Sequence, residues 1–144
     1  MTTVIKEEDL IQSIADSIQF ISYYHPVDYI RHLARAYERE QNPAAKDAIA
    51  QILTNSRMCA EGKRPICQDT GIVNVFLKIG MDVRFEGFAA GQAVEDAANE
   101  GTRRAYLSAE NTLRASVVAD PLFARKNTKD NTPAVTHVQL VPGN

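Results

Sequence analysis

The sequence has little of what several common protein classes need. Two cysteines among 144 residues are too few for a disulfide framework, so a reducing cytoplasm is the expected compartment. The 16 basic and 18 acidic residues nearly cancel, which gives no electrostatic reason to expect nucleic acid or an anionic membrane as a partner. No apolar stretch approaches the roughly 20 residues of a membrane-spanning helix. The acidic start, MTTVIKEEDL, is unlike a secretory signal.

Familiar catalytic motifs are also missing. The sequence contains no Walker loop, dinucleotide fingerprint, nucleophile elbow or CxxC pair. The histidines are scattered without metal-ligand spacing, so each is expected to be structural or exposed to solvent: His25, His32 and His137. These absences leave no standard nucleotide, protease or zinc chemistry to assign.

The length fits one domain, and its first part predicts helices. Apolar residues at spacings of three and four predict a helix over about 6–24, with an apolar face from Leu10 to Ile21. Pro26 opens a second helix, and Asn42 followed by Pro43 caps and starts a third that ends by Gly62. An arginine stripe at positions 31, 35 and 39 is expected to be a solvated helix face, with a subunit contact as the alternative.

Strand patterns begin after the helical part, which spans 1–62. The apolar run 72–79 predicts a strand buried on both faces, and alternation over 81–86 predicts a half-buried strand. A helix is expected over 88–107, a loop over 119–133 and a last strand over 134–141. The fold class is therefore α/β, with α+β as the alternative: a helical N-terminal third, then a mixed sheet with a packed helix over 63–144.

The segment from Lys63 to Gly71 stands apart from the rest of the chain. It places a thiol, an amide and a carboxylate at Cys67, Gln68 and Asp69, between a predicted helix and a predicted strand. Basic neighbours favour the thiolate, which is the metal-binding form of cysteine. The simpler interpretation is a buried cysteine beside a turn whose polar side chains bond the local backbone. A third, an Asp-Thr-Gly aspartic protease motif, fits poorly because the apolar strand follows the triplet.

The same segment carries a family resemblance. Residues 67–71, Cys-Gln-Asp-Thr-Gly, followed by an apolar strand, resemble the signature of class I fumarases and the related L-tartrate dehydratases, which are iron–sulfur hydro-lyases. The stretches at 112–114, 120–122, 126–128 and 131–134 resemble the family's downstream block in the same order. The similarity covers most of the chain.

The resemblance implies a cofactor and a set of site residues. Three cysteines would bind a [4Fe–4S] cluster whose remaining iron acts as a Lewis acid on the substrate. Cys67 would be one ligand, and Gln68 and Asp69 would bind substrate or water, with Asp69 in the catalytic role. Arg114 would clamp a substrate carboxylate.

Two alternatives to Arg114 and one unassigned thiol remain. Arg103 and Arg104 lie nearby in the sequence and are fallbacks for the carboxylate clamp. Cys59 matches no ligand position of the family and is expected to be a core or helix-face thiol.

The implied activity is the reversible hydration of fumarate to L-malate, a tricarboxylic acid cycle reaction, or of a similar dicarboxylate. Because no cysteine follows Cys67, we expect the chain to be the N-terminal part of a longer hydro-lyase, inactive alone and completed by a C-terminal part or partner subunit. The family also implies a homodimer. Two alternative interpretations remain. The chain could have a natural C-terminus after an edge strand, or it could be a non-catalytic binding or assembly domain with the same fold.

Overall fold

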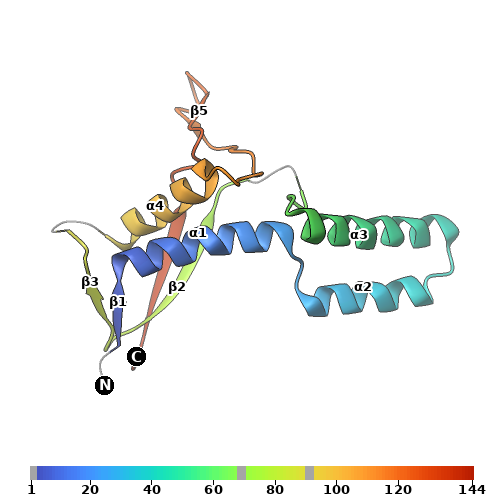
Figure 1. The fold of residues 1–144 in the computed structure, drawn as a ribbon, viewed down its shortest axis with the longest axis horizontal. Helices are drawn as coiled ribbons and strands as arrows, with labels where there is room; N and C mark the ends of the chain where they lie inside the picture. Colours follow the sequence, from blue (N-terminus) through green and yellow to red (C-terminus); the bar gives the residue numbers. More distant parts are fainter. Residues whose placement is uncertain (1–2, 68–70, 90–92) are drawn as a thin grey trace.

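The computed structural model describes residues 3–67, 71–89 and 93–144. Its helices are α1 (Glu7–Tyr23), α2 (Val27–Arg39), α3 (Pro43–Gly62) and α4 (Val94–Leu107). Its strands are β1 (Val4–Lys6), β2 (Asn74–Gly80), β3 (Arg84–Glu86), β4 (Val118–Ala119), β5 (Lys126–Asn127) and β6 (Val135–Val141). The predicted class is confirmed: the chain mixes helices and strands, and its N-terminal part is helical (Figure 1).

The three predicted N-terminal helices are present with bounds close to those expected. Helix α1 begins with three acidic residues, which interact favourably with the positive end of its dipole. Helix α3 begins after Asn42, whose side chain accepts hydrogen bonds from the amides of Ala44 (2.9 Å) and Ala45 (3.3 Å). Its last residue is Gly62, and Lys63 then adopts a left-handed conformation with φ 47°. That residue turns the chain toward the Cys67 segment.

The strands form three separate pairs in the described part of the chain. β1 pairs in parallel with β3, β2 pairs in parallel with β6, and β4 pairs antiparallel with β5. Two expectations need correction here. The strand predicted over 81–86 is confined to Arg84–Glu86 because Met81 and Asp82 form a turn, and the loop predicted over 119–133 contains the short β5 strand and part of β4.

Strand β2 is not buried on both faces as predicted. Its residues alternate between exposed and half-buried, and Phe76 is 75% exposed. Val75 packs on the core while Phe76, on the opposite face, stacks with His137 of β6 at a centroid distance of 4.6 Å. The apolar run is therefore longer than the buried surface, because the described part of the chain covers only one face of this sheet.

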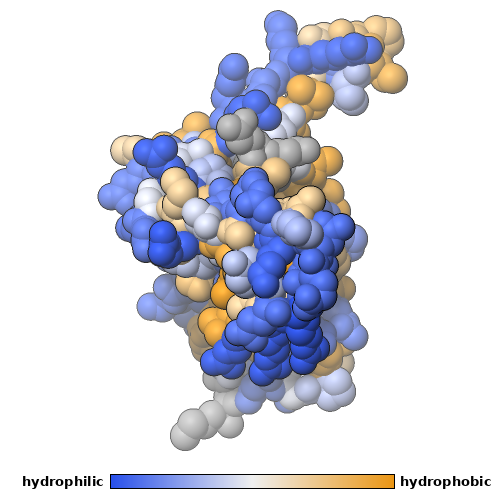
Figure 2. Space-filling view, turned by 90° about the vertical axis from the view of Figure 1, so that its right-hand side faces the viewer, coloured by the Kyte–Doolittle hydropathy of each residue, from blue (hydrophilic) through white to orange (hydrophobic). Residues whose placement is uncertain are grey.

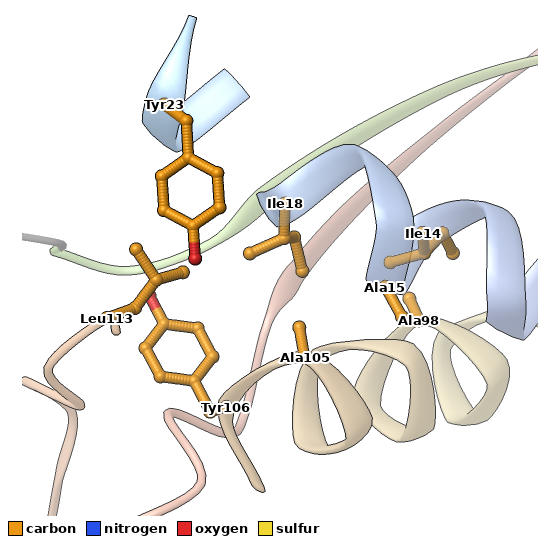
Figure 3. Packing of buried hydrophobic residues seen from close by; sticks show 8 residues of the cluster. All are labelled: Ile14, Ala15, Ile18, Tyr23, Ala98, Ala105, Tyr106 and Leu113. Atoms are coloured by element: carbon orange, nitrogen blue, oxygen red, sulfur yellow. The ribbon is translucent and has the colours of Figure 1, made fainter. Parts of the chain in front are cut away.

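The core lies where α1 crosses α4 (Figure 3). Ile14 and Ile18 of α1 face Ala98 and Ala105 of α4, and Tyr23 lies beside Tyr106 and Leu113 at one end of the core. A Cβ atom added to Gly101 would lie 2.8 Å from both the Ile11 carbonyl oxygen and the Ile14 Cβ. Glycine at this position therefore allows the two helices to approach each other closely. Ile21, expected on the same face of α1, is exposed instead.

Helices α2 and α3 form a hairpin that extends away from this core (Figure 1). Helix α2 buries no residue, and α3 buries only Ser56 and Cys59. Ile52 of α3 is exposed as well. The end of the molecule that faces the viewer in Figure 2 is largely hydrophilic. No described helix is long and apolar enough to cross a membrane.

The Gly101 contact gives a prediction about stability. We expect Gly101→Ala to lower the free energy of unfolding by about 1–3 kcal/mol, because overpacking outweighs the roughly 1 kcal/mol that alanine gains in helix propensity. Urea denaturation measures this. Gly62→Ala is the control, since its added Cβ would meet only the Arg64 side chain, at 3.6–3.7 Å. A Gly101→Ala protein as stable as wild type would contradict the close packing.

Candidate active site

The thiol of Cys67 is exposed on the segment that leads from α3 toward β2. Two backbone contacts hold this segment: the amide of Ile66 donates to the Ser22 carbonyl of α1 (2.9 Å), and the Asn55 side-chain amide donates to the Ile66 carbonyl (3.3 Å). Cys67 lines a cavity of about 390 Å³ together with His25 and mainly apolar residues from α1, α4 and the start of β2. An exposed thiol that borders a cavity can bind a ligand there.

Cys59 differs from Cys67 in every respect that matters for metal binding. It is 5% exposed on α3, and its Sγ lies 3.6 Å from the Asn55 side-chain oxygen and 3.5 Å from the Pro65 carbonyl oxygen. Its thiol thus helps to hold the chain before Cys67, as expected of a helix-face thiol. Among the described residues, no group of three or more His, Cys, Asp or Glu side chains could hold a metal ion.

Gln68 and Asp69, the predicted substrate-binding residues, lie outside the described residues, as does Thr70. The structure again describes Gly71, which has φ 56°. Its carbonyl accepts a hydrogen bond from the Asn131 side chain (3.0 Å). The structure thus describes the two residues on either side of positions 68–70, Cys67 and Gly71.

Asn131 is a connecting residue that sequence reasoning missed. Its side chain is fully buried; its oxygen accepts hydrogen bonds from the amides of Ser116 (2.6 Å) and Val117 (3.0 Å), and its amide donates to Gly71. It therefore joins the end of the Cys67 segment to the chain just after Arg114. The sequence places Asn131 in a predicted loop and in a stretch that resembles the family, but no local signal distinguishes a buried connecting amide from an ordinary turn asparagine.

Arg114 lies on the chain after α4, beside the segment that bears Cys67. The preceding Leu113 is buried, and the hydroxyl of Thr112 donates to the Lys63 carbonyl (3.0 Å). Arg114 lines a cavity of about 660 Å³ with Gly62, Arg64, Pro65 and Thr112. The structure thus places the predicted carboxylate clamp next to residues that lie two to five positions before Cys67 in the sequence.

The two fallback arginines are engaged elsewhere. Arg103 bonds the carboxylates of Glu100 (2.7 Å) and Asp130 (3.1 Å), and Arg104 bonds Glu8 and Glu100 (3.1 Å). These ion pairs link α4 to the start of α1 and to the loop before β6. Carboxylates of the chain itself thus occupy both fallback arginines.

The same ion pairs shift the acidity of their carboxylates. Hydrogen bonds from Arg103 and then Arg104 lower the pKa of Glu100 below its ordinary value of 4.5. Burial would raise the pKa of Asp130, but hydrogen bonds from Thr132 and Arg103 outweigh it, and the pKa is lowered. Both carboxylates are thus ionised at neutral pH and bind the arginines beside them.

The lowered pKa of Glu100 predicts a pH dependence. A carboxylate whose pKa is lower in the folded state stabilises the fold above its unfolded pKa, and this contribution disappears as pH falls through the folded pKa. We expect Glu100→Gln to lower the melting temperature at pH 7 and to reduce the loss of stability below about pH 4.5. Melting curves from pH 7 to pH 3 measure both effects.

The control for this experiment is Glu61→Gln. Glu61 pairs with Arg57 on the exposed face of α3, at 3.9 Å, where an ion pair contributes little. Equal pH profiles for Glu100→Gln and wild type would contradict the role given to Glu100.

Comparison with known proteins points to one family. Residues 11–144 match the sequence model of the family described as fumarate hydratase (Fumerase). A Methanocaldococcus jannaschii protein named "Putative L(+)-tartrate dehydratase subunit alpha" is 34% identical over 108 residues, 75% of this chain and 35% of that protein. The L(+)-tartrate dehydratase subunit alpha of Escherichia coli K12 is 28% identical over 136 residues, 94% of this chain and 43% of that protein.

These matches define the class of protein first: fumarate hydratases and tartrate dehydratases are both hydro-lyases. The family match covers far more than half of the chain, so the chain belongs to the fumarate hydratase (Fumerase) family. The resemblance found in the sequence is thereby confirmed. The chain spans less than half the length of these curated relatives.

Proposed function

We propose that this chain supplies one iron–sulfur ligand and part of the substrate site of a hydro-lyase that acts on a small dicarboxylate. The observation that carries the proposal is the exposed Cys67 thiol on a segment that Thr112 ties to the chain bearing Arg114. L(+)-tartrate is the first candidate substrate, since the relatives are named for it. Fumarate, with L-malate as its hydration product, is the second, because the family is described by it.

The cysteines of this chain fit a site in which the chain supplies one ligand of the cluster. Cys67 is exposed and borders a cavity, whereas Cys59 is buried and hydrogen-bonded. These are the only cysteines in the sequence, so the other ligands have to come from outside these 144 residues. A bound [4Fe–4S] cluster would supply Lewis-acid chemistry at the substrate hydroxyl. We propose the remaining C-terminal part of the enzyme or a partner subunit as the source, since the chain spans less than half the length of its relatives and these are named alpha subunits.

The chain's own residues orient the substrate. The planar guanidinium of Arg114 takes a carboxylate through two parallel hydrogen bonds, which fixes both its position and its plane. Gln68 donates an amide hydrogen bond, and the Asp69 carboxylate accepts a hydrogen bond from the substrate hydroxyl or from water. The hydrogen bond from Thr112 to Lys63 keeps the chain bearing Arg114 beside the chain that leads to Cys67.

Cys67→Ser in the complete enzyme tests the ligand assignment. We expect it to abolish cluster-dependent dehydration of tartrate and hydration of fumarate, because a serine hydroxyl does not replace a thiolate ligand of iron. Iron and sulfide content and visible absorbance after anaerobic reconstitution measure the cluster separately from turnover. Cys59→Ser is the matched control and should keep both cluster and activity, because the serine hydroxyl can keep the hydrogen bonds of the buried thiol. Wild-type activity in Cys67→Ser would remove Cys67 from the site.

The isolated 144-residue chain should behave differently from the complete enzyme. With one available thiolate, it should take up no stable cubane cluster during anaerobic reconstitution and should convert neither tartrate nor fumarate. Circular dichroism of the same sample would show whether it is folded. A stable cluster with turnover on the isolated chain would contradict the proposal that ligands come from elsewhere.

A further inference from the structure

The β2–β6 pair has large exposed apolar side chains on both of its faces. On the face turned away from the core, Phe76 and Val135 are exposed, and Phe76 stacks on the ring of His137. On the core face, Val138 and Leu140 of β6 are exposed as well. An exposed apolar surface on a sheet is typical of a site where another polypeptide packs.

This parallel pair is also short of neighbouring strands. Seven residues of β2 pair with seven of β6, and in the part of the chain that the structure describes each strand has only the other as its neighbour. Parallel sheets occur almost only where other elements cover both faces. A sheet usually needs three or more strands, or a packed helix, to be stable. The pair therefore has the properties of the inner part of a larger sheet.

The outer edge of β6 presents backbone groups that a further strand can bind. The Val135 amide donates to the Val73 carbonyl (2.9 Å), so the odd-numbered residues of β6 direct their backbone groups toward β2. The backbone groups of successive residues in a strand point to opposite sides. The amides that point to the outer edge are therefore those of Thr136, Val138 and Leu140. An edge of this kind is a template for pairing with another strand.

The length of the relatives indicates which polypeptide covers this pair. The two relatives named above are alpha subunits, and the matches span 35% and 43% of their chains. More than half of each alpha subunit therefore lies outside the matched region. A segment of the same chain is held near the sheet at a high effective concentration, which favours it over a second copy or a different subunit.

We infer that the β2–β6 pair is the docking surface for the part of an alpha subunit that lies outside these 144 residues. That part adds a strand to the outer edge of β6 and places apolar side chains over Phe76. The inference rests on the proposed function, in which further polypeptide completes the cluster site, and it names where the two parts of the enzyme meet. Strand addition supplies backbone hydrogen bonds, and burial of Phe76 supplies apolar contact.

Hydrogen exchange of single amides in the complete enzyme tests the added strand. We expect the amides of Thr136, Val138 and Leu140 to exchange about 100-fold more slowly than the Leu122 amide, which lies on an exposed turn. The amide of His137 faces β2, so its slow exchange reports that the pair itself is folded. Exchange at the three outer amides as fast as at Leu122 would overturn the inference.

Cross-linking from Lys78 in the complete enzyme identifies the polypeptide on the outer face. Lys78 is exposed on the same face of β2 as Phe76. A reagent that couples to its amine and carries a photoreactive end should join it to the same alpha chain, outside these 144 residues. Mixed isotope-labelled and unlabelled alpha chains distinguish links within a chain from links between chains. Links from Lys78 to a second copy or to a different subunit would overturn the inference.

Phe76→Ser in the complete enzyme tests the apolar cover. We expect it to lower the melting temperature by about 5 °C or more, because truncating a buried aromatic side chain is costly. Phe123→Ser is the matched control, since Phe123 is 83% exposed on the turn between β4 and β5, and it should melt within about 2 °C of wild type. A Phe76→Ser enzyme that also melts within about 2 °C of wild type would contradict the cover. If Phe76→Ser does not fold, the exchange and cross-linking of the wild-type enzyme decide.

None of these measurements depends on the cluster or on turnover. A solvent-exposed β2–β6 pair in the complete enzyme would therefore overturn this inference and leave the hydro-lyase proposal standing. Conversely, full activity of Cys67→Ser would remove the ligand assignment and leave the exchange rates and the cross-links unchanged.

Discussion

The close approach of α1 and α4 at Gly101 is the contact on which the candidate site depends. It leaves no room for a Cβ against Ile11 and Ile14, so the two helices are fixed relative to each other. The last turn of α1 then holds both site segments. The Ser22 carbonyl accepts the Ile66 amide next to Cys67, and the Tyr23 hydroxyl lies beside Thr112. A shift of α1 along α4 would move the two segments apart.

Two buried or half-buried amide side chains complete this framework. Asn131 joins Gly71 to the chain after Arg114, and Gln19 of α1 joins the Ala105 carbonyl (2.7 Å) to the Asn111 side chain (3.2 Å). Burying an amide side chain costs free energy unless its polar atoms are hydrogen-bonded. Both of these side chains make such hydrogen bonds, and their partners lie far from them in the sequence. The site is thus built on loops, but on loops whose backbone positions are set by side chains of the core.

Much of the helical part could be predicted from the sequence because its signals are local. Periodicity gives α1, and the Asn42 cap with the glycine stop gives the limits of α3. The β1–β3 pair could not be predicted, since it joins residues about 80 positions apart and each strand has only three residues. The exposure of Phe76 was missed for a related reason: an apolar run indicates what a strand could bury, but its neighbours decide which face is covered.

Some residues of the candidate site could likewise be predicted from the sequence, and others could not. The chemistry of Cys67 is local, since its basic neighbours and loop position can be seen in the sequence, and Arg114 follows from the family resemblance. Asn131 could be found only from the fold, because it acts through three backbone groups far from it in the sequence.

The arginines show why residue type alone does not identify a binding group. Arg103 and Arg104 are surrounded by Glu8, Glu100 and Asp130, and the lowered pKa values of these carboxylates show that the charges stabilise one another within the chain. An incoming carboxylate would have to displace an internal one. The carboxylates around these two arginines, rather than the arginine residue type itself, therefore make them anchors of the fold.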